Sequence, residues 1–268
     1  MNKTRIVGFL LALSALAATP SAPVGDLTPL SRDEILKISP AKAAAVLRSD
    51  ARNYDGWCAV VTYAPTALFA DENVKSSLIA LVERINKINE DWRRAYDQGE
   101  NPAGLKAQIG EGFGECQGEL ATRAIPALKG EKRALRALVE GHRDAALDFG
   151  DEAGRLAIQE RADPSSSQAR RAEMIDLLGR LKEKGTLSPS LQEQAEKTVF
   201  DASSDENAGI KSIAIRNLRH FGKEKALKRL REISETDSWS FTRKSDQKQV
   251  FPIREEAKKE FHRLLKTK

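Results

Sequence analysis

Histidine is the residue type best suited to proton transfer or metal binding near neutral pH, and it occurs at His142, His220 and His262. None of them lies in a His-Glu-x-x-His motif or beside a carboxylate that would place two metal ligands on one helical turn. His142 continues an apolar stripe with Leu135 and Leu138, which favours a satisfied interior histidine over a ligand or a base. We therefore predict no catalytic residue, no metal site and no cofactor.

Three carboxylates recur every four residues and would lie along one face of a helix: Glu111, Glu115 and Glu119. A general acid would need one of them buried against apolar neighbours, and nothing in the sequence requires that burial. We interpret them as a solvated acidic ridge. The interleaved glycines resemble a phosphate loop, but no strand precedes them and no lysine is placed to reach a phosphate.

A calcium loop is suggested by the alternating polar residues Asp201, Ser203, Asp205 and Asn207. The pattern lacks glycine at the sixth loop position and glutamate at the twelfth, both of which an EF-hand loop requires. Caps for a helix that begins near Asn207 explain these residues better.

The chain contains two cysteines, Cys58 and Cys116, which allow one intramolecular pairing. A disulfide between positions 58 apart would contribute roughly 3 to 4 kcal/mol on the chain-entropy model. We expect this bridge. Two buried thiols are the alternative, and a metal or catalytic role would need a histidine nearby in the fold.

Helical periodicity dominates the chain, strand signals are scarce, and an all-α fold of antiparallel helical hairpins is predicted. The longest apolar stripe predicts a helix over residues 72–98, with Glu83–Lys87 and Glu90–Arg94 pairs on its outer face. Further helices are predicted over residues 103–124, 131–149, 151–161, 166–184 and 188–202. Pro164 marks a soft boundary between a helical domain (23–163) and a second region (165–268), which should pack on one another.

Two stretches of the second region share one ladder of residues. The first ladder consists of Ile210, Lys211, Ala214, Leu218, Phe221 and Gly222, and a return helix then begins at Lys223. The second ladder consists of Pro252, Ile253, Arg254, Ala257, Phe261 and Leu265. Positions 210 and 253 are 43 apart, within the roughly 40 to 47 residues of HEAT and armadillo units.

This pattern resembles the HEAT family, in its short bacterial form. Ile253-Arg254-x-x-Ala257 fits that form well, and Ile210-Lys211-x-x-Ala214 departs by one conservative exchange. The resemblance implies a short α-solenoid in the second region, following an irregular helical amino-terminal part. An irregular helical bundle that mimics the ladder is the alternative.

The amino terminus has the pattern of a secretory signal peptide. Lys3 and Arg5 precede an apolar run over residues 6–16, and residues 15–17 offer a small-x-small cleavage site. We expect residues 1–17, or up to 22, to be removed. The run is about half the roughly twenty residues that a membrane anchor needs. A periplasmic or extracellular protein without a stable membrane anchor is therefore expected.

Positive charge is concentrated near the carboxyl terminus. Residues 205–268 contain 17 basic and 10 acidic residues, a net charge of +7 within a chain of +5. Such a region can attract an acidic partner. Export argues against nucleic acid, so an acidic protein, an anionic polymer or a lipid head group remains, with a solvated lysine-rich face as the alternative. A protein partner is expected.

An insertion between the two ladders supplies the candidate partner-binding residues: Trp239, Phe241, Arg243, Lys244 and Lys248. Aromatic residues and arginine dominate the energetics of many interfaces. Alternatively, Trp239 and Phe251 fold back and seal the last hydrophobic layer.

These features predict an exported, non-catalytic helical-repeat protein that binds or scaffolds a protein partner in the cell envelope. The first alternative is a helical, hydrolase-like enzyme whose active groups converge around His142 or Glu115. A deep cavity that holds one of these beside a second polar group would favour it. The second alternative is a structural cell-surface component that self-associates.

Overall fold

The protein is built almost entirely from helices. The computed structural model describes residues 30–49, 54–99, 113–245 and 247–266. Within those ranges the only strands are β1 (Phe241–Thr242) and β2 (Gln249–Val250). The predicted all-α class is confirmed. The expected signal peptide and residues 103–112 of the predicted second helix lie outside the described residues.

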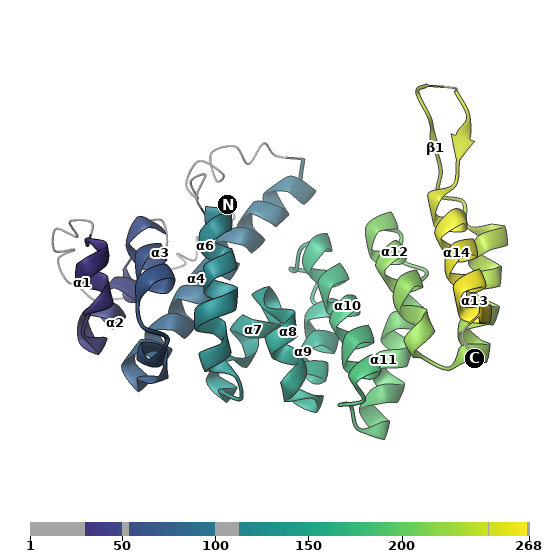
Figure 1. Ribbon diagram of the computed structural model, residues 1–268. Helices are drawn as coiled ribbons and strands as arrows, with labels where there is room; N and C mark the ends of the chain where they lie inside the picture. The colour runs from purple at the N-terminus through teal and green to yellow at the C-terminus, as the bar shows by residue number, and fades with distance from the viewer. Residues whose placement is uncertain (1–29, 50–53, 100–112, 246, 267–268) are drawn as a thin grey trace, which may run out of the picture.

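The helices form an elongated row from α1 to α14 (Figure 1). Its first half contains α1 (Arg32–Leu36), α2 (Pro40–Arg48), α3 (Tyr54–Tyr63), η1 (Thr66–Ala70), α4 (Glu72–Asp97), α6 (Phe113–Glu119), η2 (Leu120–Ala124), η3 (Ile125–Leu128), η4 (Lys132–Ala134), α7 (Leu135–Gly141), α8 (Arg143–Ala146) and η5 (Leu147–Phe149). Its second half contains α9 (Asp151–Ala162), α10 (Gln168–Lys184), α11 (Pro189–Ala202), α12 (Ala208–Asn217), η6 (Leu218–His220), α13 (Lys223–Thr236) and α14 (Pro252–Lys266).

Helix α4 begins and ends within one residue of its prediction. Asp71 caps it by accepting hydrogen bonds from the backbone N–H groups of Asn73 and Val74, at 2.9 and 3.1 Å. The apolar stripe from Val74 to Ile85 is buried and packs against α2 and α7. This long rod therefore positions the side chains of its second half against elements that follow much later in the chain.

The prediction that Glu83–Lys87 and Glu90–Arg94 pairs lie on the exposed face of α4 is wrong in part. Glu90 is 4% exposed, and its carboxylate accepts hydrogen bonds from the backbone N–H and the hydroxyl of Ser167, at 2.6 and 2.9 Å. Arg94 does pair with Glu90, at 3.6 Å, but Lys87 pairs with Asp91. Because Ser167 is the N-cap of α10, Glu90 ties α4 to the start of that helix.

The single helix predicted over residues 131–149 is broken. The chain forms η4, α7, α8 and η5, and His142 separates α7 from α8 with φ −135° and ψ 60°. Gly141 explains the position of the break. Asn86 of α4 lies directly against Gly141 and donates a hydrogen bond to the carbonyl of Ala137, at 2.8 Å. A Cβ at position 141 would overlap the Asn86 side chain, so glycine allows the two helices to approach here.

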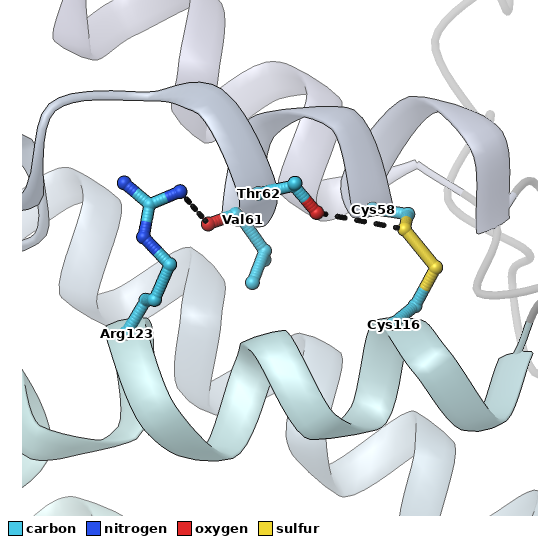
Figure 2. The surroundings of a disulfide bond; sticks show 5 residues. All are labelled: Cys58, Val61, Thr62, Cys116 and Arg123. Atoms are coloured by element: carbon cyan, nitrogen blue, oxygen red, sulfur yellow. Dashed lines mark hydrogen bonds between the residues drawn. A yellow bond between two sulfur atoms is a disulfide. The ribbon is translucent and has the colours of Figure 1, made fainter.

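The predicted disulfide is present and joins α3 to α6 (Figure 2). Cys58 and Cys116 have their Cα atoms 5.3 Å apart. Farther along the same pair of elements, Arg123 donates hydrogen bonds to the carbonyls of Val61 and Ala64, at 3.1 and 2.9 Å. These carbonyls belong to the carboxyl end of α3, where a positive charge is favourable. The bridge and Arg123 therefore hold α3 to the α6–η2 segment at two points.

Alternate helices lie side by side in the second half of the row. The alternate pairs in contact are α10 with α12, α12 with α14, and α9 with α11. The consecutive helices α13 and α14 also pack on one another. Ile210, Ala214, Leu218 and Phe221 of the first ladder are buried, as is Ile253 of the second. This arrangement agrees with stacked helical hairpins, and the HEAT-like solenoid itself stays a prediction.

The hydrophobic core crosses the boundary expected near Pro164. Buried residues from Ile35 to Leu264 form one cluster, and α10 contacts both α4 and α7. The two regions do pack on one another, as predicted. No helix in the described ranges has the length and apolar character needed to cross a bilayer.

Candidate functional sites

The insertion between α13 and α14 forms a short β-hairpin, residues 238–251, which extends beyond the ends of its neighbouring helices (Figure 1). Its two strands are antiparallel, with Phe241 opposite Val250 and Thr242 opposite Gln249. Gln247 adopts a positive φ of 57° and its N–H bonds to the carbonyl of Arg243, which closes the turn.

Two aromatic side chains of the hairpin face solvent. Trp239 is 39% exposed and Phe241 is 47% exposed, with their rings edge to face at 6.1 Å between centroids. Phe251 is half-buried, and the guanidinium of Arg254 stacks over its ring at 4.3 Å. The hypothesis that Trp239 folds back to seal the core does not fit this exposure, whereas Phe251 does pack against α14.

The base of the hairpin is held by Asp237. Its carboxylate pairs with Lys211 of α12 at 2.6 Å and accepts a hydrogen bond from the backbone N–H of Trp239 at 3.0 Å. Its carbonyl accepts a hydrogen bond from Nε of Arg254, at 2.6 Å. Lys211 and Arg254 are the basic residues of the two sequence ladders, so both ladders contact Asp237, one at its carboxylate and one at its backbone carbonyl.

The structure places all five predicted partner-binding residues on this hairpin. Arg243, Lys244 and Lys248 are exposed near its turn, beyond the aromatic pair. An exposed aromatic patch with surrounding cations fits an acidic protein surface in chemistry. Binding itself stays a prediction.

A second site is a cavity of about 340 Å³ in the middle of the helical row, and it includes His142, around which the enzyme alternative placed its active groups. Its walls come from α4, α6 with η2, the α7–α8 break and α10, and we call it the central cavity. Six charged residues line it: Glu90, Arg93, Glu140, Arg143, Arg170 and Glu173.

Most charges of the central cavity are paired with one another. Arg93 forms a bidentate ion pair with Glu173, at 3.0 and 2.8 Å, and Arg143 reaches the same carboxylate at 3.2 Å. Arg170 pairs with Glu140 and also with Glu160, the latter at 2.9 Å. Geometry of this kind fixes the walls and leaves little net charge for a ligand.

His142 faces the central cavity and lacks a hydrogen bond from its ring within the described protein. Burial lowers the pKa of the imidazole from 6.5 to about 4, because desolvation disfavours the charged form. The ring is therefore neutral near pH 7. His142 lies in the interior as expected, but at a break between α7 and α8 instead of within one continuous helix.

The described lining of the central cavity contains no serine, threonine, cysteine, lysine or tyrosine. Glu90, Glu140 and Glu173 are the lining residues whose carboxylates could act as a nucleophile or a general acid. A histidine with a pKa of about 4 is a weak base at neutral pH. The side chains of Glu111 and Glu115 lie outside the described residues.

The remaining candidate residues form a helix cap, an ion pair and a side-chain contact with the backbone. Asn207 caps α12 by accepting a hydrogen bond from the N–H of Ile210, at 3.0 Å. Asp205 pairs with Arg161, and His262 contacts the carbonyl of Lys258 at 2.7 Å. Within the described ranges no cluster of three potential ligands is arranged to hold a metal ion.

Comparison with known proteins assigns the chain to no family, because no protein-family model and no curated protein matches its sequence. The HEAT resemblance rests on the two ladders alone.

Proposed function

We propose that this chain is an exported, non-catalytic binding protein of the cell envelope that holds an acidic protein partner on the hairpin. The exposed aromatic pair carries the proposal. Trp239 and Phe241 would bury apolar surface only by contacting another molecule, and large aromatic side chains contribute strongly when they are buried in an interface.

The fixed base of the hairpin supports the same proposal. Asp237, Lys211 and Arg254 hold the hairpin to two helices, so ordering it on binding would cost little conformational entropy. The exposed Arg243, Lys244 and Lys248 favour an acidic partner.

Export is supported by the Cys58–Cys116 disulfide, because disulfides persist mainly in oxidising compartments. The expected signal peptide points to the same compartments.

Site-specific crosslinking in intact cells tests the partner site. A photoreactive residue at Thr242 should capture a partner in the envelope, and Trp239→Ala should abolish that crosslink without changing the melting temperature. Leu265→Ala is the matched control, because Leu265 is 53% exposed in the last turn of α14, whereas the hairpin joins the first turn of that helix. A crosslink that survives Trp239→Ala, or a melting temperature several degrees lower, contradicts the proposal.

A hydrolase is the second candidate, favoured by the position of His142 beside charged groups in the central cavity. It ranks lower because Glu173, Glu140 and Glu90 are engaged by Arg93, Arg170 and Ser167, and because a histidine with a pKa of about 4 is a weak base at neutral pH. Turnover of ester or glycoside substrates that is lost in His142→Gln would support it.

A further inference from the structure

The central cavity contains hydrogen-bonding groups that no other group of the described residues uses. Asn89 from α4, Gln117 from α6 and the ring of His142 all line it, and none of these side chains hydrogen-bonds to another group of the described chain. All three side chains are partly buried, so their donors and acceptors can be reached from the cavity. Groups from three separate elements thus face one cavity and are available to a ligand.

The unpaired groups are uncharged and can both donate and accept. The amides of Asn89 and Gln117 each supply two donors and one acceptor oxygen, and a neutral imidazole supplies one of each. A charged ligand would find its counter-ions already engaged, because Arg93 and Arg143 share Glu173 and Arg170 holds Glu140. The charged side chains of the cavity would therefore not select a charged ligand.

The cavity is also too polar for an aliphatic ligand. Ile85 and Ala121 are its main apolar contributions, and its volume of about 340 Å³ lies at the small end of the range for ligand sites, roughly 300 to 1,000 Å³. Hydroxyl groups donate and accept in the same way as the groups that face them. A small polyhydroxylated molecule thus fits both the size and the chemistry.

We propose that the central cavity binds an uncharged sugar residue through Asn89, Gln117 and His142. This site is separate from the hairpin and does not depend on the partner proposed above.

Gly118 of α6 provides a way to close the cavity without disturbing the fold. It lines the cavity, and a Cβ added there would meet no atom within 4 Å. Gly118→Leu would therefore extend into the cavity, and it also replaces glycine inside a helix by a better helix former. Thr122→Leu is the matched control, because Thr122 is exposed one turn farther along and does not line the cavity.

Saturation-transfer NMR on the full chain tests the proposal, with glucose, galactose, mannose and N-acetylglucosamine as probes at millimolar concentration and glucuronate as the anionic comparison. At least one neutral sugar should receive saturation, more strongly than glucuronate. Gly118→Leu should abolish this signal and Thr122→Leu should retain it. Asn89→Ala and Gln117→Ala should each weaken binding by about five- to tenfold, the loss of one hydrogen bond.

Circular dichroism and melting curves establish that each variant is folded. Asn89→Ala and Gln117→Ala remove no hydrogen bond among the described residues, so they keep the test decisive if Gly118→Leu fails to fold. The proposal is overturned if no neutral sugar binds, if glucuronate binds better, or if both the cavity-filling and the alanine variants bind as the native chain does.

Discussion

Gly141 and Gly179 let neighbouring helices approach more closely than any larger residue would permit. In each case an asparagine of another helix covers the glycine, Asn86 over Gly141 and Asn217 over Gly179. Both asparagines are nearly buried, and Asn217 donates a hydrogen bond to the carbonyl of Ile213 at 2.9 Å. Single glycines thus decide where helices cross, and at Gly141 also where the central cavity opens.

Gly179→Ala should destabilise the protein by about 1 to 3 kcal/mol, because the added methyl group would overlap Asn217 and force repacking. Gly118→Ala is the matched comparison: it faces open space and should stabilise the helix by up to about 1 kcal/mol. Urea unfolding of the two variants measures the difference. Equal midpoints would contradict this account of the helix crossing.

His142 makes stability depend on pH. Its pKa is 6.5 in the unfolded chain and about 4 in the folded one. Between these values the unfolded chain binds the proton and the folded chain does not, so stability is complete above pH 6.5 and is lost as pH falls toward 4. The slope is at most about 1.4 kcal/mol per pH unit.

His142→Gln should therefore show a smaller loss of melting temperature between pH 7 and pH 5 than the native chain. His220, whose pKa burial also lowers, titrates in both proteins and cancels in the comparison. Parallel curves for the two proteins would show that His142 is not held neutral by folding.

At the scale of elements, the sequence predicted individual helices well and their connections poorly. α10 and α11 begin within two residues of their predicted starts, because Ser167 and Pro189 are start signals that can be recognised in the local sequence. The break at His142 was missed because it depends on Asn86, in a helix far away in the sequence. The central cavity was missed for the same reason, since its walls come from four elements.

The burial of Glu90 shows how a local rule can mislead. Spacing of four residues predicted an exposed Glu90–Arg94 pair, but the main partner of Glu90 is Ser167, 77 positions away. A carboxylate placed at the start of α10 satisfies an N–H group that the helix leaves unpaired and adds a favourable charge at its positive end.

Glu90→Gln should destabilise the protein by about 1 to 3 kcal/mol, because a buried acceptor of two hydrogen bonds is replaced by a neutral amide. Asp91→Asn is its control, since the Asp91 side chain is 40% exposed and its ion pair with Lys87 contributes less than about 1 kcal/mol. Chemical denaturation distinguishes them. Similar losses in both variants would mean that Glu90 does not cap α10.

At the scale of the whole molecule, the helices form a row in which most contacts join neighbours (Figure 1). Some links nevertheless connect residues far apart in sequence. The Cys58–Cys116 bridge is covalent, and two cysteines permit only this pairing, which is why it could be predicted. The Arg93–Glu173 pair, between α4 and α10, could not.

Reduction of the bridge, or the Cys58→Ala/Cys116→Ala double variant, should cost roughly 3 to 4 kcal/mol on the chain-entropy model. For a chain of this size that corresponds to a melting temperature lower by about 10 °C. Calorimetry with and without reductant measures the shift. The double variant should melt at the same temperature in both conditions, because the chain has no other cysteine.

Asp237 gives the hairpin two separate attachments to the helical row. Its carboxylate binds Lys211 of α12, and its carbonyl binds Arg254 of α14. A force applied to the hairpin would therefore reach α12 and α14 through these two contacts. The peptide links of the hairpin to α13 and α14 would then not bear the whole force. Asp237 thus anchors the hairpin, and tension on the hairpin is shared among its attachments.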